Sequence, residues 1–447
     1  MNTPLFRADL HIHSRYSRAT STRLTPRNLA AWAAVKGLHV VGTGDITHAR
    51  WRDSLRETLE WDEASGLYRL RNPRGFLDEL PEFAHLERSV PPPLFMLQGE
   101  ISSIYKRGGK VRRVHNLVYF PTLEAAEAFA TRLGGIGNLE SDGRPIVGLD
   151  SHDLLEMVLE TAPGAFVVPA HIWTPWYSLF GSKSGFDSMQ ECFGDLTHEI
   201  FALETGLSSD PDMNRMWSAL DAYRLVSNSD AHSGENLGRE ATLFSGTPSY
   251  LGIYNSLKYP ETAGEGCSFL GTLEFFPEEG KYHLDGHRAC NVVLEPEESR
   301  KRGGICPVCG KPLTLGVLYR VQELADRPAP IHQPGNTFAS LVPLPELLGE
   351  ILGVGAKSKK VGALYAKALH KFGSELDILQ TIPTSELEKF HPALGESLHR
   401  MRSGQVTRKG GYDGEYGVVR VFSPQEQQSI RHGSLFASAR PLFPHQE

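Results

Sequence analysis

Short apolar runs recur along the first half of the chain, and most of them are followed by a stretch with helical periodicity. Strands that alternate with helices are typical of a mainly parallel sheet. Seven such runs predict a closed or nearly closed barrel, and in barrels of this kind the functional site lies at the carboxyl ends of the strands. The expected strands are 6–10, 38–41, 94–97, 114–120, 166–168, 200–203 and 225–226, and the expected helices are 26–36, 123–133, 152–161 and 213–222.

The remaining segments differ in composition. The stretch 52–93 is rich in charge and is expected to be an insertion, whereas the proline-rich stretch 328–345 predicts a linker. Helical periodicity follows over 344–402, and the tail 440–447 predicts a disordered segment or a short peptide. The expected domains are a barrel at 1–250, a connector with a cysteine-containing segment at 251–330, and a linker with a helical DNA-binding region at 331–447.

Composition narrows the class of protein. A chain of 447 residues is long for one domain, and its hydrophobic share of 40% is sufficient for real cores. We expect no membrane span and no signal peptide, because no long apolar stretch occurs and the N-terminus leads straight into a strand. Five cysteines do not make a disulfide framework, which favours a cytoplasmic location. The net charge of −7 does not favour nucleic acid, although basic runs such as 106–113 are either phosphate contacts or solvated faces.

Metal-binding residue types follow the expected strands. His11 and His13 end the first strand, and the two-residue period of a strand places both imidazoles on one face. A single His-x-His is a weak signal, but nearly every later strand also carries a histidine or a carboxylate, almost always at its carboxyl end, and a series of coincidences does not explain that. The residues concerned are Asp45, His48, Glu100, His115, His171, Glu204, Asp230 and His232.

This mixture of imidazoles and carboxylates indicates a cluster of divalent metals. It suits Zn, Mn or Fe better than Ca or Mg alone. The ligands are too numerous for one ion, so we expect two or three ions (Zn, Mn or Mg), with Glu100 as the best bridge. Clustered ions are typical of displacement at phosphorus. The predicted reaction is phosphoester hydrolysis, and metal-assisted amide hydrolysis is the alternative that this ligand set leaves open.

The order of these residues resembles the PHP (polymerase and histidinol phosphatase) family over 1–235. The resemblance implies a distorted (β/α)7 barrel with a trinuclear site. Two departures concern the third metal position, since Arg18 and Ala19 stand where the family often has an acidic residue or histidine, and Asp45 is separated from His48 by two residues. Asp45 is therefore either a ligand or a residue that orients a ligand imidazole. The ligands implied by the resemblance are His11, His13, His48, Glu100, His115, His171, Asp230 and His232.

A second metal site is expected between the barrel and the helical region. Cys290 is followed after fifteen residues by Cys306-Pro307-Val308-Cys309-Gly310-Lys311, a sequence typical of a zinc knuckle. The fourth ligand is His287, which has the better spacing, or His283. We predict one structural zinc here.

Several further side chains are candidates for DNA contact. Residues 352–360 resemble a helix-hairpin-helix turn, in which backbone N–H groups and nearby lysines hold a phosphate; an ordinary helix break is the alternative. The aromatic loop after His171 predicts either base stacking or packing against the barrel. A glycine-rich hairpin or loop at 410–422 presents two tyrosines. The residues concerned are Trp173, Trp176, Tyr177, Lys357, Lys359, Lys360, Tyr412 and Tyr416.

The order of barrel, cysteine segment and helical C-terminus is similar to that of DNA-repair endonucleases of the PHP family, and the similarity covers nearly the whole chain. It implies a nick on the 5′ side of a deaminated base (uracil, hypoxanthine or xanthine) or an abasic site. A base that is inspected must leave the stack, which requires a pocket. The implied partner is damaged DNA, with a sliding clamp as an additional candidate, and the residues expected to carry the reaction are Asp230, Glu100 and His171.

Three other functions share parts of this pattern. A PHP-type phosphatase acting on small molecules needs no further ~200 residues beyond the barrel. An inactive DNA-binding module would have lost several of the ligands. A DNA exonuclease has the same barrel chemistry but requires a DNA end.

Overall fold

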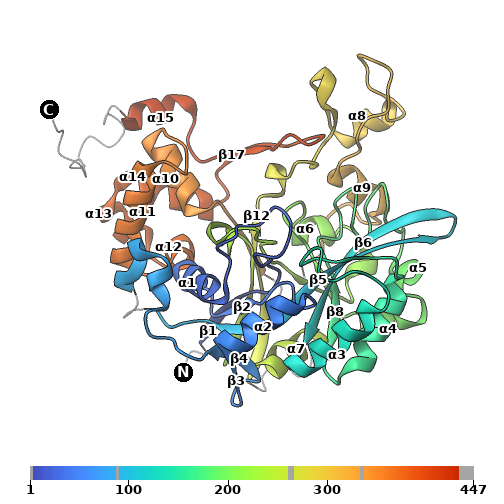
Figure 1. Cartoon of the computed structure of the whole chain (residues 1–447). Helices are drawn as coiled ribbons and strands as arrows, with labels where there is room; N and C mark the ends of the chain where they lie inside the picture. The colour runs from blue at the N-terminus through green and yellow to red at the C-terminus, as the bar shows by residue number, and fades with distance from the viewer. Residues whose placement is uncertain (1–3, 87–89, 260–265, 333–336, 432–447) are drawn as a thin grey trace.

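The computed structural model describes residues 4–86, 90–259, 266–332 and 337–431, so the expected tail at 440–447 lies outside it. Its centre is a mixed α/β barrel (Figure 1). Strands β1, β2, β5, β6 and β8 are joined side by side by hydrogen bonds, and β9 pairs with β10. The barrel strands are β1 (Leu5–Asp9), β2 (Val40–Gly42), β5 (Leu94–Arg107), β6 (Lys110–Phe120), β8 (Phe166–Pro169), β9 (Ala202–Glu204) and β10 (Arg224–Val226).

Loops rather than strands complete the barrel. Ile12, after β1, forms a parallel bridge with Ala231, after β10. On the other side, the backbone N–H of Ile172 donates to the carbonyl of Glu204 at 3.1 Å, which ties β8 to β9. Closure therefore occurs just beyond the carboxyl ends of these strands, the edge at which we expected the site. The distorted seven-stranded barrel predicted from the sequence is confirmed.

One barrel strand runs opposite to the prediction of a parallel sheet. β6 is antiparallel to both β5 and β8, and its pairing with β5 extends from Leu97↔Phe120 to Arg107↔Lys110. Gly108 and Gly109 form the turn between them, with φ of 59° and 73°. Such a short turn can join only antiparallel strands, because a parallel pair needs a crossover connection. The tip of this hairpin extends beyond the barrel in Figure 1 and carries the basic run 106–113.

Helices and additional strands surround the barrel. Helix α1 begins as expected: Thr25 accepts a hydrogen bond from the backbone N–H of Asn28, and Pro26 occupies the first turn. Beside β1, strands β11 and β12 extend the sheet in the antiparallel sense. The elements are α1 (Pro26–Lys36), α2 (Ala49–Thr58), α3 (Leu123–Gly134), β7 (Ile146–Val147), α4 (Ser151–Thr161), α5 (Met189–Phe193), α6 (Pro211–Asn214), β11 (Ala241–Gly246), α7 (Tyr250–Lys258) and β12 (Cys267–Phe275). Within the described ranges, no helix is both long and apolar enough to cross a membrane.

The stretch 52–93 adds a hairpin between two barrel strands, and this hairpin of β3 (Leu59–Asp62) and β4 (Leu67–Leu70) joins the sheet beside β5. Two local predictions were wrong. Residues 337–341, expected in a linker, form β15 (Thr337–Leu341), which pairs in parallel with β12. The helix expected at 213–222 is reduced to the single turn of α6 and a 3₁₀ turn at Ser218–Leu220.

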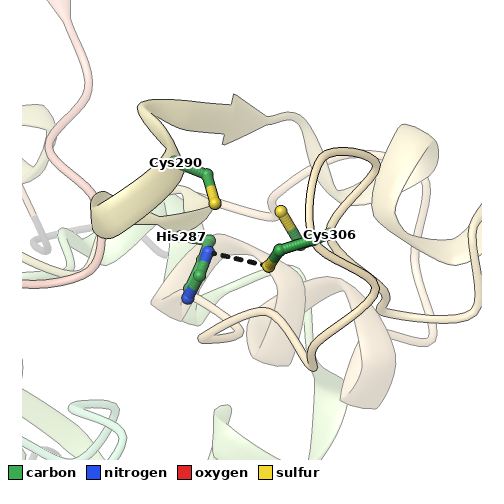
Figure 2. A group of neighbouring side chains, drawn as sticks. His287, Cys290 and Cys306 are labelled. Carbon is green, nitrogen blue, oxygen red and sulfur yellow. Dashed lines mark hydrogen bonds between the residues drawn. The ribbon is translucent and has the colours of Figure 1, made fainter.

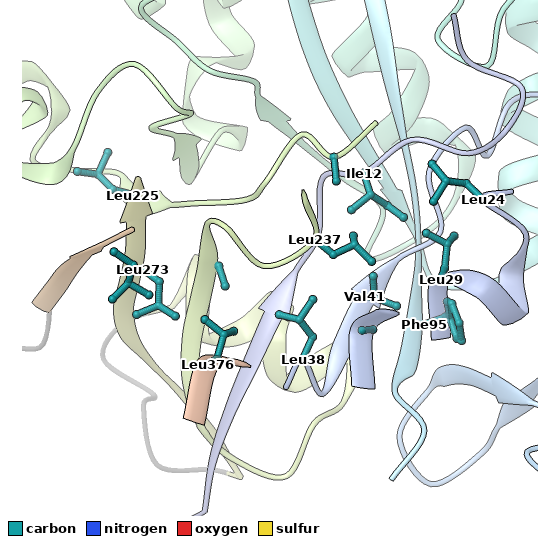
Figure 3. Packing of buried hydrophobic residues seen from close by; sticks show 14 of the residues in the cluster. Ile12, Leu24, Leu29, Leu38, Val41, Phe95, Leu225, Leu237, Leu273 and Leu376 are labelled. Atoms are coloured by element: carbon teal, nitrogen blue, oxygen red, sulfur yellow. The ribbon is translucent and has the colours of Figure 1, made fainter. Parts of the chain in front are cut away.

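The helical C-terminal region shares its core with the barrel. Figure 3 shows Leu376 packed near Leu38 and Leu237, which belong to the barrel half of the chain. A buried ion pair joins Lys36 Nζ to Glu375 Oε2 at 2.6 Å, and both side chains are only 4% exposed. Nearby, Arg7 and Asp377 pair at 2.9 Å. The C-terminal helices are α10 (Leu344–Leu352), α11 (Lys359–Phe372), α12 (Glu375–Gln380), α13 (Thr384–Phe390), α14 (Pro392–Arg402) and α15 (Pro424–Arg431).

The cysteine-containing segment stands above the barrel and meets the C-terminal hairpin (Figure 1). Arg320, on α9, fixes the segment to the aromatic loop by donating to the carbonyls of Phe180 at 2.9 Å and Phe186 at 3.1 Å. A short bridge between Leu284 and Tyr412 ties it to the hairpin. The elements are β13 (Asp285–His287), β14 (Val292–Leu294), α8 (Pro296–Lys301), α9 (Val317–Leu324), β16 (Thr407–Lys409) and β17 (Val418–Arg420).

Candidate metal centre

The first group of metal-ligating atoms lies just beyond the ends of β1 and β10 and beside the middle of β5, which continues past Glu100 to Arg107. His11, His13, Glu100 and Asp230 each present one ligand atom, and these atoms all lie within 4.8 Å of one another. His13 Nε2 is 3.2 Å from Glu100 Oε2 and 3.1 Å from Asp230 Oδ1. His11 Nε2 lies 3.6 Å and 3.5 Å from the same two oxygens. Two imidazoles and two carboxylates thus converge on one point.

A second group lies beside the first and shares Glu100. It consists of Glu100, His115 and His171. His115 Nδ1 is 2.5 Å from Glu100 Oε1, and His171 Nε2 is 3.3 Å from the same oxygen. Because Oε2 of Glu100 faces the first group and Oε1 faces the second, this carboxylate has the placement that a bridging ligand requires.

The chemistry of these residues fits divalent cations. His11 Nε2 is fully buried and has no hydrogen-bond partner within the described part of the chain, and a buried polar atom without a partner is costly. Burial lowers the pKa of His11, but the charges of Glu204 and Asp230 outweigh burial and raise it well above its usual range. For Glu100 the effects have the opposite signs: burial raises its pKa, but the positive charges of His115 and Arg144 outweigh burial and hold the pKa well below the usual value. Histidines and carboxylates thus stand side by side in a buried site. A bound cation would give His11 Nε2 the partner that it lacks among the described residues.

Glu204 supports the first group from behind. Its carboxylate lies 3.0 Å and 3.1 Å from Nδ1 of His11, and it also accepts from the backbone N–H of His171 at 2.9 Å and from Asn228 at 2.9 Å. A carboxylate on the far nitrogen fixes the tautomer of a metal-ligating histidine and makes it a stronger ligand. The sequence showed Glu204 at a strand end but gave it no role; such a position is the signal that could have identified it.

Asp45 lies behind His13 in the same way. Its carboxylate is 3.2 Å from His13 Nδ1 and accepts from Ser17 Oγ at 2.8 Å and from the backbone N–H of Ser14 at 2.8 Å. It is fully buried and belongs to neither group of ligand atoms. Of the two roles that the sequence left open for Asp45, the geometry favours the orienting one.

His48 and His232 lie outside both groups. The His48 ring stacks on Tyr16 with 4.3 Å between centroids, since the turn from Asp45 (φ 46°) places it at the start of α2. The His232 ring is 4.4 Å from that of His13, and its Nδ1 lies 2.9 Å from the carbonyl of Asp230. Within the described residues, two groups of barrel ligands converge, and the third group that the family resemblance implied does not.

A pocket of about 460 Å³ opens beside the two groups. Asp230, His171 and Arg144 line it on the metal side, and Trp176 and Tyr177 contribute aromatic surface. Tyr177 has φ of 63° and lies against the ring of His115, with 4.8 Å between centroids. One ligand in this pocket could therefore place a phosphate at the metal-ligating groups and stack on these rings.

Trp173 was wrongly predicted to contact DNA. It is 1% exposed, packs against Phe180 and Trp217 at 5.2 Å and 6.2 Å, and donates to Asn214 at 2.7 Å. Trp173 therefore packs the aromatic loop against the barrel, which was the alternative to base stacking in the sequence analysis. Trp176, in contrast, is half-buried, lines the pocket and has its ring 5.6 Å from that of Tyr282.

The other residues predicted to contact DNA are more exposed. Lys357, Lys359 and Lys360 are exposed at the start of α11, where Ser358 accepts a hydrogen bond from the backbone N–H of Val361. In the C-terminal hairpin, Tyr416 is 71% exposed, with Lys281 Nζ 4.5 Å from its ring centroid. Tyr412 is half-buried, because it packs on Gly286. The lysines and Tyr416 are free to meet a ligand.

The predicted zinc ligands converge as well. His287, Cys290, Cys306 and Cys309 present ligand atoms that all lie within 4.8 Å of one another. Figure 2 shows the side chains of His287, Cys290 and Cys306 pointing toward one centre. Backbone N–H groups of Cys309 and Val308 outweigh the effect of burial and lower the pKa of the Cys306 thiol to about 7, which favours the thiolate form that binds metal. His283 is not in the group, so the geometry favours His287 as the fourth ligand.

Replacing Cys306 and Cys309 by serine is expected to release one zinc per chain and unfold the segment around β13 and β14. The local apolar cluster there is small, consisting of Val292, Cys306 and Leu313 with a few partly buried neighbours, so metal binding would supply most of its folding energy. Zinc content and protease sensitivity between 283 and 316 measure the effect. Cys192→Ser, at a buried cysteine of the barrel, is the control; a double variant with full zinc and unchanged protection would contradict the site.

Comparisons with known proteins agree with this architecture. A family model described as the MJ0043 C-terminal domain matches residues 343–405. The uncharacterized protein YqxK of Bacillus subtilis is 30% identical over 429 residues, which cover 92% of this chain and 98% of YqxK. The uncharacterized protein MJ0043 of Methanocaldococcus jannaschii is 32% identical over 262 residues, which cover 58% of this chain but only 32% of MJ0043, so the chain spans about a third of that protein.

Two solved structures match almost the whole chain. The lesion-specific endonuclease PfuEndoQ of Pyrococcus furiosus is 29% identical, with a TM-score of 0.80 over 95% of this chain and 99% of that one. Endonuclease Q in complex with a duplex that carries an abasic lesion at the active site is 30% identical, with a TM-score of 0.80 over 95% and 98%. Barrel, metal-ligating groups and relatives together define a metal-dependent phosphodiesterase. The chain belongs to the endonuclease Q family.

Proposed function

We propose that this protein nicks duplex DNA on the 5′ side of a damaged nucleotide, either a deaminated base or an abasic site. The observation that carries the proposal is the pocket of about 460 Å³ that Asp230, His171, Trp176 and Tyr177 line together. It offers aromatic surface for an unstacked nucleotide directly beside the groups suited to phosphate chemistry. Endonuclease Q, whose structure contains an abasic lesion at the active site, supports this placement.

The two groups of ligands that share Glu100 would hold the catalytic ions, with His11, His13 and Asp230 on one side and His115 and His171 on the other. Bound divalent ions supply a nucleophile from water at neutral pH and stabilise charge on the leaving oxygen. The native metal would be Zn, Mn or Mg, and the Cys/His group would hold the structural zinc.

The protein's own residues orient the reaction. Asp230 is held by His11 and His13, yet its side chain is 27% exposed toward the pocket. Nδ1 of His171 is fixed by Ser178 Oγ at 3.2 Å, so that Nε2 points at Glu100. Rigid placement of this kind reduces the reorganisation needed in the transition state. Asp230, Glu100 and His171 would therefore carry the reaction.

Exposed basic and aromatic side chains outside the pocket suit a long polyanion better than a small phosphate ester. The basic tip of the β5–β6 hairpin, the exposed lysines at 357–360 and Tyr416 lie on different elements around the barrel. Contacts to several phosphates fix the register of a duplex, whereas a small-molecule phosphatase has no use for them. A DNA exonuclease keeps the same chemistry and is separated from the proposal by experiment. A sliding clamp would be a further partner.

Incubation with Mn or Mg and closed-circular DNA that contains one uracil, one hypoxanthine, one abasic site or no lesion tests the proposal. The expected result is a single nick 5′ to each lesion, with 3′-hydroxyl and 5′-phosphate ends, and no cut in undamaged circles. A requirement for a DNA end would instead indicate an exonuclease. Release of phosphate from a small ester without any cut in DNA would move the protein to the phosphatase class.

A further inference from the structure

The loop 141–145 lines the pocket beside the metal centre and is held in place by close contacts on both sides. Gly143 donates its backbone N–H to the carbonyl of Tyr16 at 3.0 Å and packs so closely on Asp45 that an added Cβ would lie 2.2 Å from Oδ2 of that carboxylate. The carbonyl of Pro145 accepts from the backbone N–H of Ser102 at 3.0 Å, and β7 then pairs with β5. The loop is therefore a fixed part of the site.

This loop brings two arginines to the pocket. Arg144 is adjacent to Gly143, and its Nη1 lies 3.2 Å from Glu100 Oε2. Arg18 reaches the same pocket from the loop after β1. Asp142, whose side chain is 10% exposed, holds both: its Oδ1 accepts from the backbone N–H groups of Arg18 and Arg144, each at 3.2 Å, and its Oδ2 lies 3.4 Å from Arg18 Nε.

The hydrogen bonds of Arg144 leave most of its guanidinium free. In the part of the chain that the structure describes, its side chain donates to Glu100 alone, through Nη1. That side chain is 28% exposed and lines the pocket beside Asp230 and His171. Arg18 is 75% exposed. A planar guanidinium with unused N–H donors is suited to bidentate contact with phosphate oxygens.

With metals bound, Arg144 would be a further positive charge beside Glu100. Glu100 would face a cation on each side, so a third positive group beside it would be repelled unless an anion completed the set. A phosphodiester is the anion that the proposed function brings to this pocket. Among the described residues no third group of barrel ligands converges, so Arg144 is the additional positive group that the structure places directly on Glu100.

We propose that Arg144 and Arg18 form a phosphate clamp: Arg144 binds a non-bridging oxygen of the phosphate that is cut, and Arg18 binds the neighbouring phosphate of the same strand. The inference rests on the proposed function and gives it a substrate-positioning element. Asp142 sets the spacing of the two arginines and Gly143 sets the closeness of the loop to the site.

Equilibrium binding of an abasic duplex, measured without added Mg or Mn, tests the clamp, and a gel run afterwards verifies that the duplex is intact. Arg144→Gln and Arg18→Gln are each expected to weaken binding roughly tenfold. Each should reduce the slope of log Kd against log salt by about one. Arg144→Lys should recover part of the loss. Arg132→Gln, which breaks a surface pair with Glu160 on α4, is the control and should match the parent chain.

A duplex with a neutral methylphosphonate at the cut position provides the decisive comparison. It should bind the parent chain more weakly than the normal duplex, and this penalty should be clearly smaller in Arg144→Gln, because one partner of the phosphate is already missing. An equal penalty in both proteins, or unchanged affinity and salt slope in Arg144→Gln, would overturn the clamp. Melting temperature and metal content verify that the variant is folded and loaded. The exposed Arg18→Gln keeps the test possible if Arg144→Gln does not fold.

Failure of the proposed function gives a different result. If the parent chain cuts no lesion, the nicking proposal fails, while the KM for bis(p-nitrophenyl) phosphate still reports on Arg144. A higher KM with a similar kcat in Arg144→Gln would support phosphate binding by this side chain; an unchanged KM would refute it.

Discussion

The Asp230→Asn variant is expected to nick lesion-containing DNA about a thousandfold more slowly than the parent chain. Ions bound at such a site contribute several kcal/mol to the transition state, and about 1.4 kcal/mol corresponds to a factor of ten in rate. Asp230 lies 3.1 Å from His13 Nε2 in the first group of ligand atoms and is the most exposed of them. Asparagine removes its charge but tolerates the backbone at φ 47° as aspartate does.

Single-turnover nicking, together with metal analysis and thermal melting, measures this effect. Asp53→Asn, at an exposed carboxylate that pairs with Arg56 on α2, is the matched control and should leave all three unchanged. Normal turnover of Asp230→Asn with a full complement of metal would disprove the role of Asp230.

The Lys36→Met variant is expected to lose about 3–5 kcal/mol of unfolding free energy, the usual consequence of leaving one charge of a buried ion pair without its partner. Glu375 would keep only the hydrogen bonds from Tyr365 Oη at 2.6 Å and the backbone N–H of Leu344 at 3.0 Å. Adding Glu375→Gln to Lys36→Met should recover much of the loss, because the stranded charge is then removed.

Denaturant unfolding measures the difference. Lys389→Met, which breaks an exposed pair with Glu386 on α13, is the control and should cost less than about 1 kcal/mol. Equal losses in Lys36→Met and Lys389→Met would show that the barrel and the helical region are not held together by this pair.

The barrel and most of its site could be predicted because the signals were local. A histidine or carboxylate in or after each apolar run identified His11, His13, Glu100, His115, His171 and Asp230, and the structure brings all six together in two groups that share Glu100. The three late cysteines and His287 were identifiable from spacing, and they converge as well.

What the sequence did not reveal depends on contacts between distant segments. Arg144 comes from a loop whose position is set by the approach of Gly143 to Asp45, almost a hundred residues earlier, and no local pattern encodes that approach. The antiparallel course of β6 was hidden because the basic tip of its hairpin has the composition of a solvated loop. Trp173 could not be distinguished from Trp176, since which face of the loop is buried depends on Trp217 and Asn214.

The shared core and the buried pair of Lys36 with Glu375 have a consequence for the DNA. The lysines at the start of α11 and the metal centre belong to one rigid framework, so their separation is set before any duplex arrives. A duplex that touches both must then adopt the curvature that this framework dictates. Bending costs on the order of 1–6 kcal/mol and depends on sequence. The stiffness of the base pairs around a lesion, and not the lesion alone, would therefore influence how quickly each site in a genome is repaired.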